Sequence, residues 1–318
     1  MMGTERKEDL RDAMVRALIA FAEDGGDLLV LCSDSTSSAR IGPFQERFPD
    51  RLVDVGIAEQ NLLGVAAGLA LGGHTVVTAN AACFALTRSG EQLKNDVCYS
   101  RTNVKVAGLN AGVSYGPLGS THHALDDVSI VRGLGEILIF APADGPEAES
   151  AFRWALEYDG PVYVRMDGQA LPVLHDPGYR FRPGRLEVLR EGRDLTVFAM
   201  GSAVFEAVRA GEILARSGLT AEVVNVPSIR PADTEGILAS LGRTGLAVSV
   251  EEHSTHGGLG SLVAETIADA GLGARLVRIG IPEGSFSKAG PRDLIRAHYG
   301  IDAAGIVRTV TEAFRGRR

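Results

Sequence analysis

Short runs rich in Val, Ile and Leu alternate along the chain with longer runs rich in Ala and Leu. The first kind of run is typical of strands buried on both faces of a parallel sheet, and the second is typical of the helices that cover it. This alternation predicts an α/β fold with parallel-sheet-rich domains. The chain has 318 residues, of which 45% are hydrophobic, so it is long enough for two domains, each with its own core.

The predicted elements divide the chain into two parts. In the first half we expect strands at residues 27–32, 74–80, 103–109, 137–142 and 161–166. Helices are expected to begin near residues 58, 87, 126 and 146. In the second half we expect strands at 194–200, 220–226, 245–252 and 274–280, and helices at 203–217, 234–241 and 259–270.

Between the two parts, residues 171–192 contain three prolines and three glycines, which interrupt any longer period. This composition favours an inter-domain linker. We therefore predict a first domain over residues 1–170, a linker over 171–192 and a smaller second domain over 193–318.

The net charge of -8 and the absence of a basic stripe argue against nucleic acid as a partner. Residues 1–24 have the pattern of a charged amphipathic helix and lack the apolar core of a signal peptide. No run of about 18 uncharged apolar residues predicts a membrane span. We therefore expect a cytoplasmic protein that binds neither nucleic acid nor membrane.

The three cysteines, Cys32, Cys83 and Cys98, lie in or beside apolar stretches and lack the spacing of a metal site. We interpret them as reduced thiols of the core.

Two common catalytic patterns are missing. The chain has no G-x-G-x-x-G after its first strand and no P-loop. The stretch GGLGSLVAE (257–265) follows a strand and opens a helix, so its free N–H groups could receive an anion. The same glycines could equally serve close packing between strand and helix.

Glu59 is the first acid of interest, because it precedes a long run of small apolar residues in DVGIAEQNLLGVAAGLALGG (54–73). At the first turn of a helix its charge is stabilised by the helix dipole. The helix that follows is apolar nearly all round and is therefore expected to be buried. Glu59 is thus either a helix-terminal charge or a carboxylate held in a dry cleft to bind a protonated heterocyclic nitrogen.

The same stretch, followed by ANAACFALTRSGEQLKND, GLNAGVSYGPLGSTHHALDDVSIVRGL and GPVYVRMDGQALPVL, resembles the pyrimidine-binding domain of the transketolase family of thiamine-diphosphate enzymes. The stretches VEEHSTHGGLGSLVAE and GIPEGSFSKAG are similar to the C-terminal domain of that family. The resemblance spans nearly the whole chain. Its I-A-E-Q-N form is most similar to split transketolases, in which two shorter chains replace one long chain.

The resemblance assigns roles to cofactor-binding residues. The glutamate that matches Glu59 hydrogen-bonds N1′ of the cofactor's aminopyrimidine and thereby activates the thiazolium carbon. Phe84 matches an aromatic residue that lies against the pyrimidine, although Ala81 replaces a second aromatic residue of that pocket. Ile57, two residues before Glu59, is a further candidate for cofactor binding.

The resemblance also implies substrate-side residues. His122 matches a histidine near the reacting carbon, with proton relay or a hydrogen bond to a substrate hydroxyl as its role, and His123 replaces the usual glutamine. Arg165 matches an arginine that contacts substrate phosphate. For each of these three residues a purely structural hydrogen bond or ion pair is the alternative.

The loop around Asn110 departs from the pattern of the sugar-phosphate transketolases. Asn110 replaces a histidine, and Pro117 and Leu118 replace two acids. Sites that hydrogen-bond a hydroxyl discriminate strongly between substrates, so these changes predict altered substrate selectivity. We therefore treat Asn110 and His123 as candidate substrate-binding residues, and expect an unusual acceptor, such as a carrier-bound aldehyde or one from secondary metabolism.

The family holds the cofactor's diphosphate through Mg²⁺ with a G-D-G…N motif, and this chain contains no G-D-G. The resemblance therefore implies that a separate N-terminal subunit anchors the diphosphate and Mg²⁺, in an α₂β₂ heterotetramer, and that no residue of this chain binds the metal.

We expect a C-terminal transketolase subunit, active only with that partner, which transfers a two-carbon ketol unit from a ketose to an aldehyde. Three alternatives stay open: the β subunit of a 2-oxoacid decarboxylase or dehydrogenase, a deoxyxylulose-phosphate-synthase-like enzyme, and a noncatalytic regulatory subunit.

Overall fold

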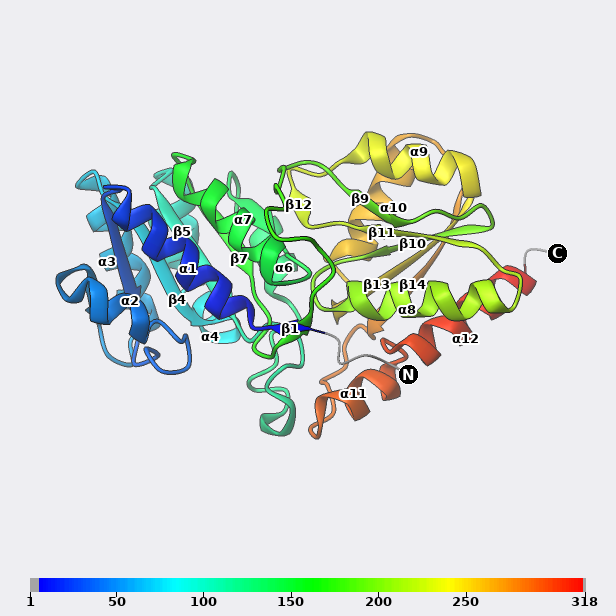
Figure 1. Ribbon diagram of the computed structural model, residues 1–318, viewed down its shortest axis with the longest axis horizontal. Coiled ribbons are helices and arrows are strands. Elements are labelled where there is room, and N and C mark those ends of the chain that lie inside the picture. Colours follow the sequence, from blue (N-terminus) through cyan, green and yellow to red (C-terminus); the bar gives the residue numbers. More distant parts are fainter. Residues whose placement is uncertain (1–5, 317–318) are drawn as a thin grey trace.

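The computed structural model of the protein describes residues 6–316. Two α/β units lie side by side along the longest axis, and each has a central sheet covered by helices (Figure 1). The predicted α/β class with two domains is confirmed.

The first sheet has seven strands in the order β12-β6-β7-β5-β4-β2-β3. Six of them run parallel: β2 (Leu28–Cys32), β3 (Leu52–Asp54), β4 (Thr75–Ala81), β5 (Val104–Leu109), β6 (Leu138–Phe140) and β7 (Val162–Arg165). The seventh, β12 (Ser228–Arg230), comes from the second half of the chain and pairs antiparallel with β6. A strand from the second half of the chain therefore forms one edge of the first sheet.

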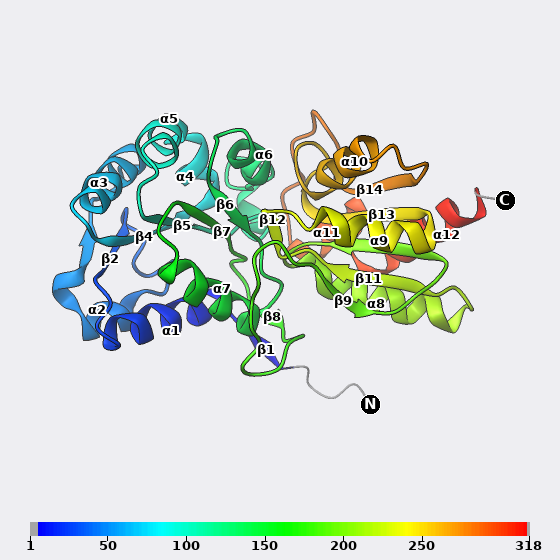
Figure 2. The ribbon, with the colours of Figure 1, turned by 90° about the horizontal axis from the view of Figure 1, so that it is seen from above.

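Helices cover both faces of this sheet (Figure 2). One face carries α1 (Leu10–Glu23) and α7 (Gly145–Glu157), which pack on each other. The other elements of this half are α2 (Gly42–Arg47), η1 (Pro49–Arg51), α3 (Glu59–Leu71), α4 (Ala82–Thr87), α5 (Gly90–Gln92), η2 (Leu93–Tyr99), η3 (Gly116–Leu118) and α6 (Asp127–Arg132). The helix expected near residue 87 is therefore several short pieces, of which η2 is a π-helix.

The second sheet has the order β14-β13-β10-β11-β9. Its parallel strands are β10 (Leu195–Ala199), β11 (Ala221–Asn225), β13 (Leu246–Ser254) and β14 (Arg275–Ile281), and β9 (Glu187–Arg190) joins antiparallel to β11. The helices of this half are α8 (Ala203–Arg216), α9 (Thr234–Thr244), α10 (Leu259–Asp269), α11 (Arg292–Tyr299) and α12 (Ala303–Arg315).

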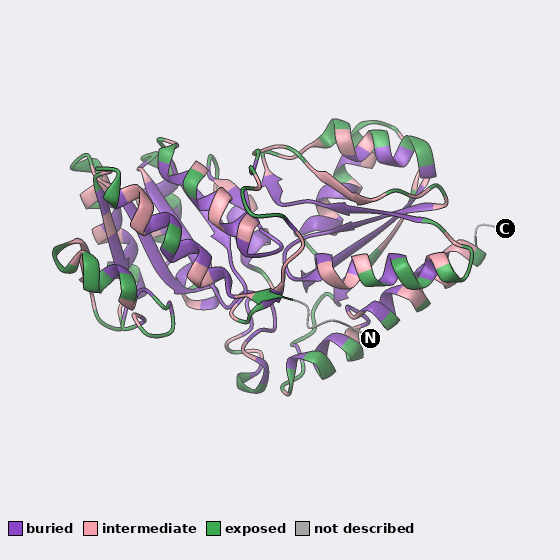
Figure 3. Ribbon diagram, in the orientation of Figure 1, coloured by how far each residue is buried: buried purple, intermediate pink, exposed green. Residues whose placement is uncertain are grey.

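The long strands agree with the sequence predictions to within two residues at each end. Their strong signal comes from complete burial: all six residues of β5 and all five of β10 are buried, and Figure 3 shows both sheets buried between half-exposed helices. The short strands were missed because two to four residues carry no measurable period.

The segment 171–192 is more structured than a plain linker. It contains β8 (Leu171–Pro172), which pairs with β1 (Lys7–Glu8), and also the edge strand β9. Our division of the chain at residues 170 and 192 therefore stays a prediction, while part of the segment belongs to the sheets.

Residues 1–5 of the expected N-terminal helix lie outside the described part of the chain, and α1 itself begins at Leu10. Across residues 6–316, the helices are too short or too polar for a membrane-spanning segment.

Candidate functional site

The candidate residues gather at the carboxyl ends of the parallel strands of the first sheet. Glu59 begins α3 shortly after β3, Phe84 lies on α4 directly after β4, and Asn110 follows β5. In open α/β sheets this edge is where ligands bind, because loops from several strands meet there. The sheet thus brings together residues that lie far apart in the sequence.

Glu59 is a nearly buried carboxylate with a weak partner. Its side chain is 9% exposed, and its Oε2 lies 3.7 Å from Nε of Arg88, whose own side chain is 64% exposed. No hydrogen bond to the Glu59 carboxylate is present among residues 6–316. A buried charge is normally paired and hydrogen-bonded, so the carboxylate is free to accept a hydrogen bond from a ligand.

The ion-pair partner of Glu59, Arg88, lines a cavity of about 520 Å³. The cavity is also lined by Phe84, Cys83, Thr87, Ser120, Thr121, His123 and Asp126. Burial raises the pKa of the Cys83 thiol to about 12, so this cysteine stays protonated and acts as a wall of the cavity. The three cysteines are buried free thiols, as expected.

His122 lies between two aromatic rings, next to residues that line this cavity. Its ring is 5.3 Å from the ring of Phe84 and 5.6 Å from that of Tyr115, edge-on in both cases. The Nδ1 atom lies 2.9 Å from the hydroxyl of Thr121, which fixes the orientation of the imidazole. The structure therefore brings Phe84 and His122 together.

Asn110 belongs to the same group through Tyr115. Its Nδ2 donates to the hydroxyl of Tyr115 at 2.8 Å, and its backbone has a positive φ of 54°. Asparagine is one of the few residues that tolerate this conformation. Asn110 is buried, so it supports the aromatic wall, and any contact with substrate stays a prediction.

His123 is held by protein groups on both ring nitrogens. Its Nε2 lies 3.1 Å from the carbonyl oxygen of Gly116, and its Nδ1 contacts the hydroxyl of Ser287. Burial lowers the pKa of His123, so the ring is neutral, with Nε2 donating and Nδ1 accepting. Both ring nitrogens of His123 thus have partners inside the protein, which favours the structural alternative, and contact with a substrate stays a prediction.

Arg165 is likewise held by protein groups. Its guanidinium is buried between the two domains, where Nε donates to Asp127 at 2.8 Å and Nη2 donates to the carbonyl of Glu252 at 2.8 Å. This ion pair is the structural alternative considered for Arg165, and burial keeps the guanidinium away from the cavity. These contacts favour the structural alternative for Arg165, and contact with a substrate phosphate stays a prediction.

Ile57 does not join the group either. Its side chain is 80% exposed, on the turn that leads into α3. Leu118, in the loop that carries His122, and Phe286 in the second half are exposed to 54% and 88%. These three apolar side chains are exposed, and none of them lines the cavity.

Two neighbours of the site, Arg88 and Tyr115, were missed by the sequence reasoning. Arg88 lies one helical turn after Phe84, and this spacing could have placed both on one face of a helix. Tyr115 gave no such signal, because its position depends on the course of a loop.

In the glycine-rich stretch 257–265, the backbone N–H groups that could bind an anion already have an acceptor within the protein. The buried carboxylate of Glu251 accepts hydrogen bonds from the backbone N–H groups of Leu259 and Gly260, each at 2.8 Å. The start of α10 is therefore satisfied internally, so the packing interpretation holds for these glycines.

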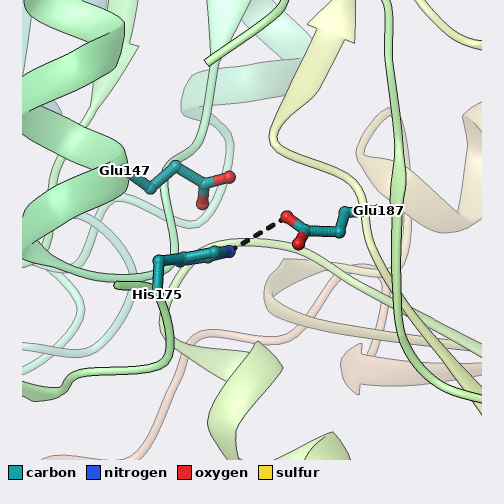
Figure 4. A group of neighbouring side chains, drawn as sticks. All are labelled: Glu147, His175 and Glu187. Atoms are coloured by element: carbon teal, nitrogen blue, oxygen red, sulfur yellow. Dashed lines mark hydrogen bonds and ion pairs between the residues drawn. The ribbon is translucent and has the colours of Figure 1, made fainter. Parts of the chain in front are cut away.

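A second polar cluster lies between the domains, away from the cavity. Figure 4 shows Glu147 of α7, His175 and Glu187 of β9 pointing toward one another. His175 lies 2.9 Å from Asp144 through Nδ1 and 3.1 Å from Glu187 through Nε2.

The Glu147 carboxylate in this cluster accepts hydrogen bonds from the backbone N–H of Ala143, the amide of Asn225 and the hydroxyl of Tyr179. Each potential ligand atom thus has a protein partner, so we interpret the cluster as a junction between the two domains.

Comparisons with known proteins agree with this geometry. Residues 6–173 match the family model "Transketolase, pyrimidine binding domain", and residues 184–306 match "Transketolase, C-terminal domain". The chain is 52% identical to a subunit of apulose-4-phosphate transketolase from Actinobacillus succinogenes, covering 94% of this chain and 96% of the relative. It is 37% identical to the protein of the same name from Phocaeicola vulgatus, covering 95% and 96%.

Among solved structures, the chain resembles a split gene transketolase described as an inactive β4 tetramer, with a TM-score of 0.90 and 35% identity. The match covers 98% of this chain and 99% of that one. Both domains, the relatives and the solved structure thus lead to one conclusion: the chain belongs to the transketolase family and is similar over its whole length to separate transketolase subunits.

Proposed function

We propose that this chain is the pyrimidine-binding subunit of a two-component, thiamine-diphosphate-dependent transketolase. The observation that carries the proposal is the Glu59 carboxylate, which is nearly buried and has no hydrogen bond in the described part of the protein. Its ion-pair partner Arg88 lines a cavity together with Phe84. Homologous transketolase subunits support a role in group transfer.

The residues present fit the aminopyrimidine of thiamine diphosphate. A buried carboxylate that lacks a donor is suited to accept a hydrogen bond from a protonated ring nitrogen. The Phe84 ring offers a flat apolar surface beside the cavity, against which a heterocycle can pack. When bound, thiamine diphosphate supplies a carbon nucleophile and an electron sink for cleaving the bond next to a ketose carbonyl.

The protein side chains orient the reactants, and they accept, hold or transfer protons. The carboxylate of Glu59 would accept the hydrogen bond at the pyrimidine nitrogen and so favour its protonated form. His122, whose Nδ1 is engaged by Thr121, has Nε2 available for a substrate hydroxyl or for proton transfer. Phe84 and Tyr115 hold that imidazole by edge-on ring contacts.

A partner chain completes the site in this proposal. The chain has no G-D-G motif, so the diphosphate and Mg²⁺ would be held by an N-terminal chain that carries one, in an α₂β₂ assembly. The exposed apolar side chains of Ile57, Leu118 and Phe286 suit a surface that a partner covers. The two apulose-4-phosphate transketolase relatives are themselves named as single subunits of an enzyme, which supports the same division of labour.

For the substrate we propose apulose-4-phosphate or a closely related phosphorylated ketose as the ketol donor. The names of the two relatives at 52% and 37% identity support this choice. The altered loop around Asn110 and Leu118 is consistent with selectivity unlike that for ordinary pentose phosphates. A specialised or carrier-bound aldehyde as the acceptor stays a hypothesis.

The decisive experiment reconstitutes this chain with the neighbouring G-D-G-bearing chain, thiamine diphosphate and Mg²⁺. Ketol transfer from apulose-4-phosphate to an aldose phosphate is compared with transfer from a linear pentulose phosphate and with CO₂ release from pyruvate. We expect transfer from the first donor to be fastest. CO₂ release without ketol transfer would favour a 2-oxoacid decarboxylase or a deoxyxylulose-phosphate-synthase-like enzyme instead.

A further inference from the structure

The loop that carries His122, residues 110–126, is shaped by the C-terminal domain as well as by its own domain. Its first residues are anchored in the first domain, where Ala111 N–H donates to the carbonyl of Met166 at 2.9 Å. Two later anchors come from β13: the Val113 N–H donates to the Glu252 carboxylate at 2.8 Å, and the Ser254 N–H donates to the Leu125 carbonyl at 2.7 Å.

The centre of the loop is held by a short segment, residues 285–290, between β14 and α11. Ser120 donates its hydroxyl to the carbonyl of Ser287 at 2.7 Å, and the hydroxyl of Ser287 contacts Nδ1 of His123. The Gly290 N–H lies 3.4 Å from the Gly116 carbonyl, which also receives Nε2 of His123. Ser287 is buried, whereas Ser285 and Phe286 beside it are exposed.

These contacts form a continuous path of hydrogen bonds. Nε2 of His123 faces a carbonyl oxygen, which only accepts, so this nitrogen carries the proton. Nδ1 is then an acceptor, and the donor it faces is the Ser287 hydroxyl. The turn that places His122 belongs to the same unit, because the N–H groups of His122 and His123 both donate to the Gly119 carbonyl, at 3.0 and 3.1 Å.

The backbone of the loop lies too close to the C-terminal domain for side chains at two positions. A Cβ on Gly112 would lie 2.6 Å from the Glu252 carboxylate, and a Cβ on Gly116 would lie 2.9 Å from the Gly290 carbonyl. Both glycines also have positive φ angles, of 67° and 51°. The backbone of the loop is therefore in close contact with the second domain at both Gly112 and Gly116.

We propose that Ser287 of the C-terminal domain is a positioning residue for the reaction, acting through His123 to hold the turn that places His122 against Phe84. His123 thus has a defined task even though its ring nitrogens are not free for a substrate. The C-terminal domain, which contributes no residue to the cavity lining, then sets the geometry of the site. This inference rests on the proposed function, because it concerns the same site.

The test compares Ser287→Ala with the conservative Ser287→Thr and with Ser285→Ala as a matched control. Ser285 lies two residues away on the same segment and is exposed. Amide hydrogen exchange of residues 115–123 is measured in the full chain, without cofactor or partner. Loss of the hydroxyl leaves a buried acceptor unpaired, so we expect exchange about tenfold faster in Ser287→Ala only.

Kinetics of the reconstituted pair give the second readout. We expect kcat for ketol transfer to fall about tenfold in Ser287→Ala and to recover in Ser287→Thr, with the affinity for thiamine diphosphate unchanged, because Glu59 and Phe84 lie on other elements. Unchanged exchange and unchanged kcat in Ser287→Ala would overturn the proposal.

The two proposals fail in different ways. A wild-type pair that binds no thiamine diphosphate and transfers no ketol unit would refute the proposed function, and the exchange comparison would still test the Ser287 contact. Faster exchange in Ser287→Ala together with wild-type kcat in an active pair would refute the positioning role alone.

Discussion

Glu59 combines burial with a single loose ion pair, which is costly for the folded state unless a ligand uses the carboxylate. Its partner Arg88 is largely exposed, so the attraction over 3.7 Å is weakened by solvent. The position of Glu59 at the start of α3 adds stabilisation from the helix dipole, but the dipole makes no hydrogen bond. The contacts of Glu59 within the chain therefore contribute little to stability, and its role toward a cofactor stays a prediction.

Replacing Glu59 with Gln keeps the volume and removes the charge. We expect turnover of the reconstituted pair to fall by about 100-fold or more, as for the loss of a positioned acid-base group. The free energy of unfolding should change by less than about 1 kcal/mol, because no hydrogen bond in the protein is lost. Steady-state kinetics and urea unfolding measure the two quantities. Turnover equal to wild type would favour the noncatalytic alternative.

Arg165 should behave in the opposite way, as a structural residue. Arg165→Met leaves Asp127 buried without its cation, so we expect a loss of about 3–5 kcal/mol in the free energy of unfolding, measured in urea. The double variant Arg165→Met/Asp127→Asn should recover part of this loss, because the remaining amide is neutral. If the Arg165→Met protein is as stable as wild type and has a raised KM, Arg165 binds the substrate and its role is not structural.

The conformation of the loop after β5 depends on its contacts with the second domain. The helix α3, in contrast, forms because of its run of small apolar residues. Gly112 in that loop has φ 67° and almost touches Glu252, whereas Gly68 in α3 has open space around its Cβ position. Two glycines of the same chain should therefore respond to alanine with opposite signs.

We expect Gly112→Ala to destabilise the fold by more than about 1 kcal/mol, through backbone strain and the contact with Glu252. Gly68→Ala, in the interior of a helix, should stabilise it by roughly 0.5–1 kcal/mol. Thermal or urea unfolding of the two variants beside wild type measures both effects. Equal effects in the two variants would contradict this account of the loop.

Across the molecule, the two domains are joined by polar contacts that cross between them. The pairing of β6 with β12, the hydrogen bond from Arg165 to the Glu252 carbonyl and the cluster around His175 all connect the halves. Burial alone would lower the pKa of His175, but the carboxylates of Asp144 and Glu187 outweigh it and raise this pKa to about 10. Glu147 and Tyr179 face the same imidazole from α7 and from the connecting segment.

The raised pKa of His175 predicts a pH-dependent stability. In the unfolded chain a histidine loses its proton near pH 6.5, whereas the folded cluster retains it up to about pH 10. The stabilisation is therefore complete below pH 6.5 and is lost as the pH rises toward 10. His175→Gln should remove this part of the pH dependence, of the order of a few kcal/mol. Urea unfolding of both proteins between pH 6 and 10 tests this, and parallel curves would refute it.

The α/β class and the long strands can be predicted from the amino-acid sequence alone, and Glu59 can be recognised as a candidate from its local pattern, whereas Phe84 is a candidate only through the resemblance to the family. Buried strands produce continuous apolar runs, and an acid at the start of an apolar helix stands out locally, so both can be recognised without a structure. Short edge strands such as β9 and β12 could not be recognised, because their pairing partners lie elsewhere in the chain.

The tasks of Arg165, His123 and Ser287, in contrast, depend on tertiary contacts. The sequence does not distinguish an arginine or a histidine that faces a substrate from one that contacts a buried protein group. Which of the two applies depends on partners that are dozens of residues away in the chain. The contact between Ser287 and His123 forms only when the two domains pack together. The sequence can therefore indicate which residues carry chemistry, whereas the environment of each one is set by the packing of the domains.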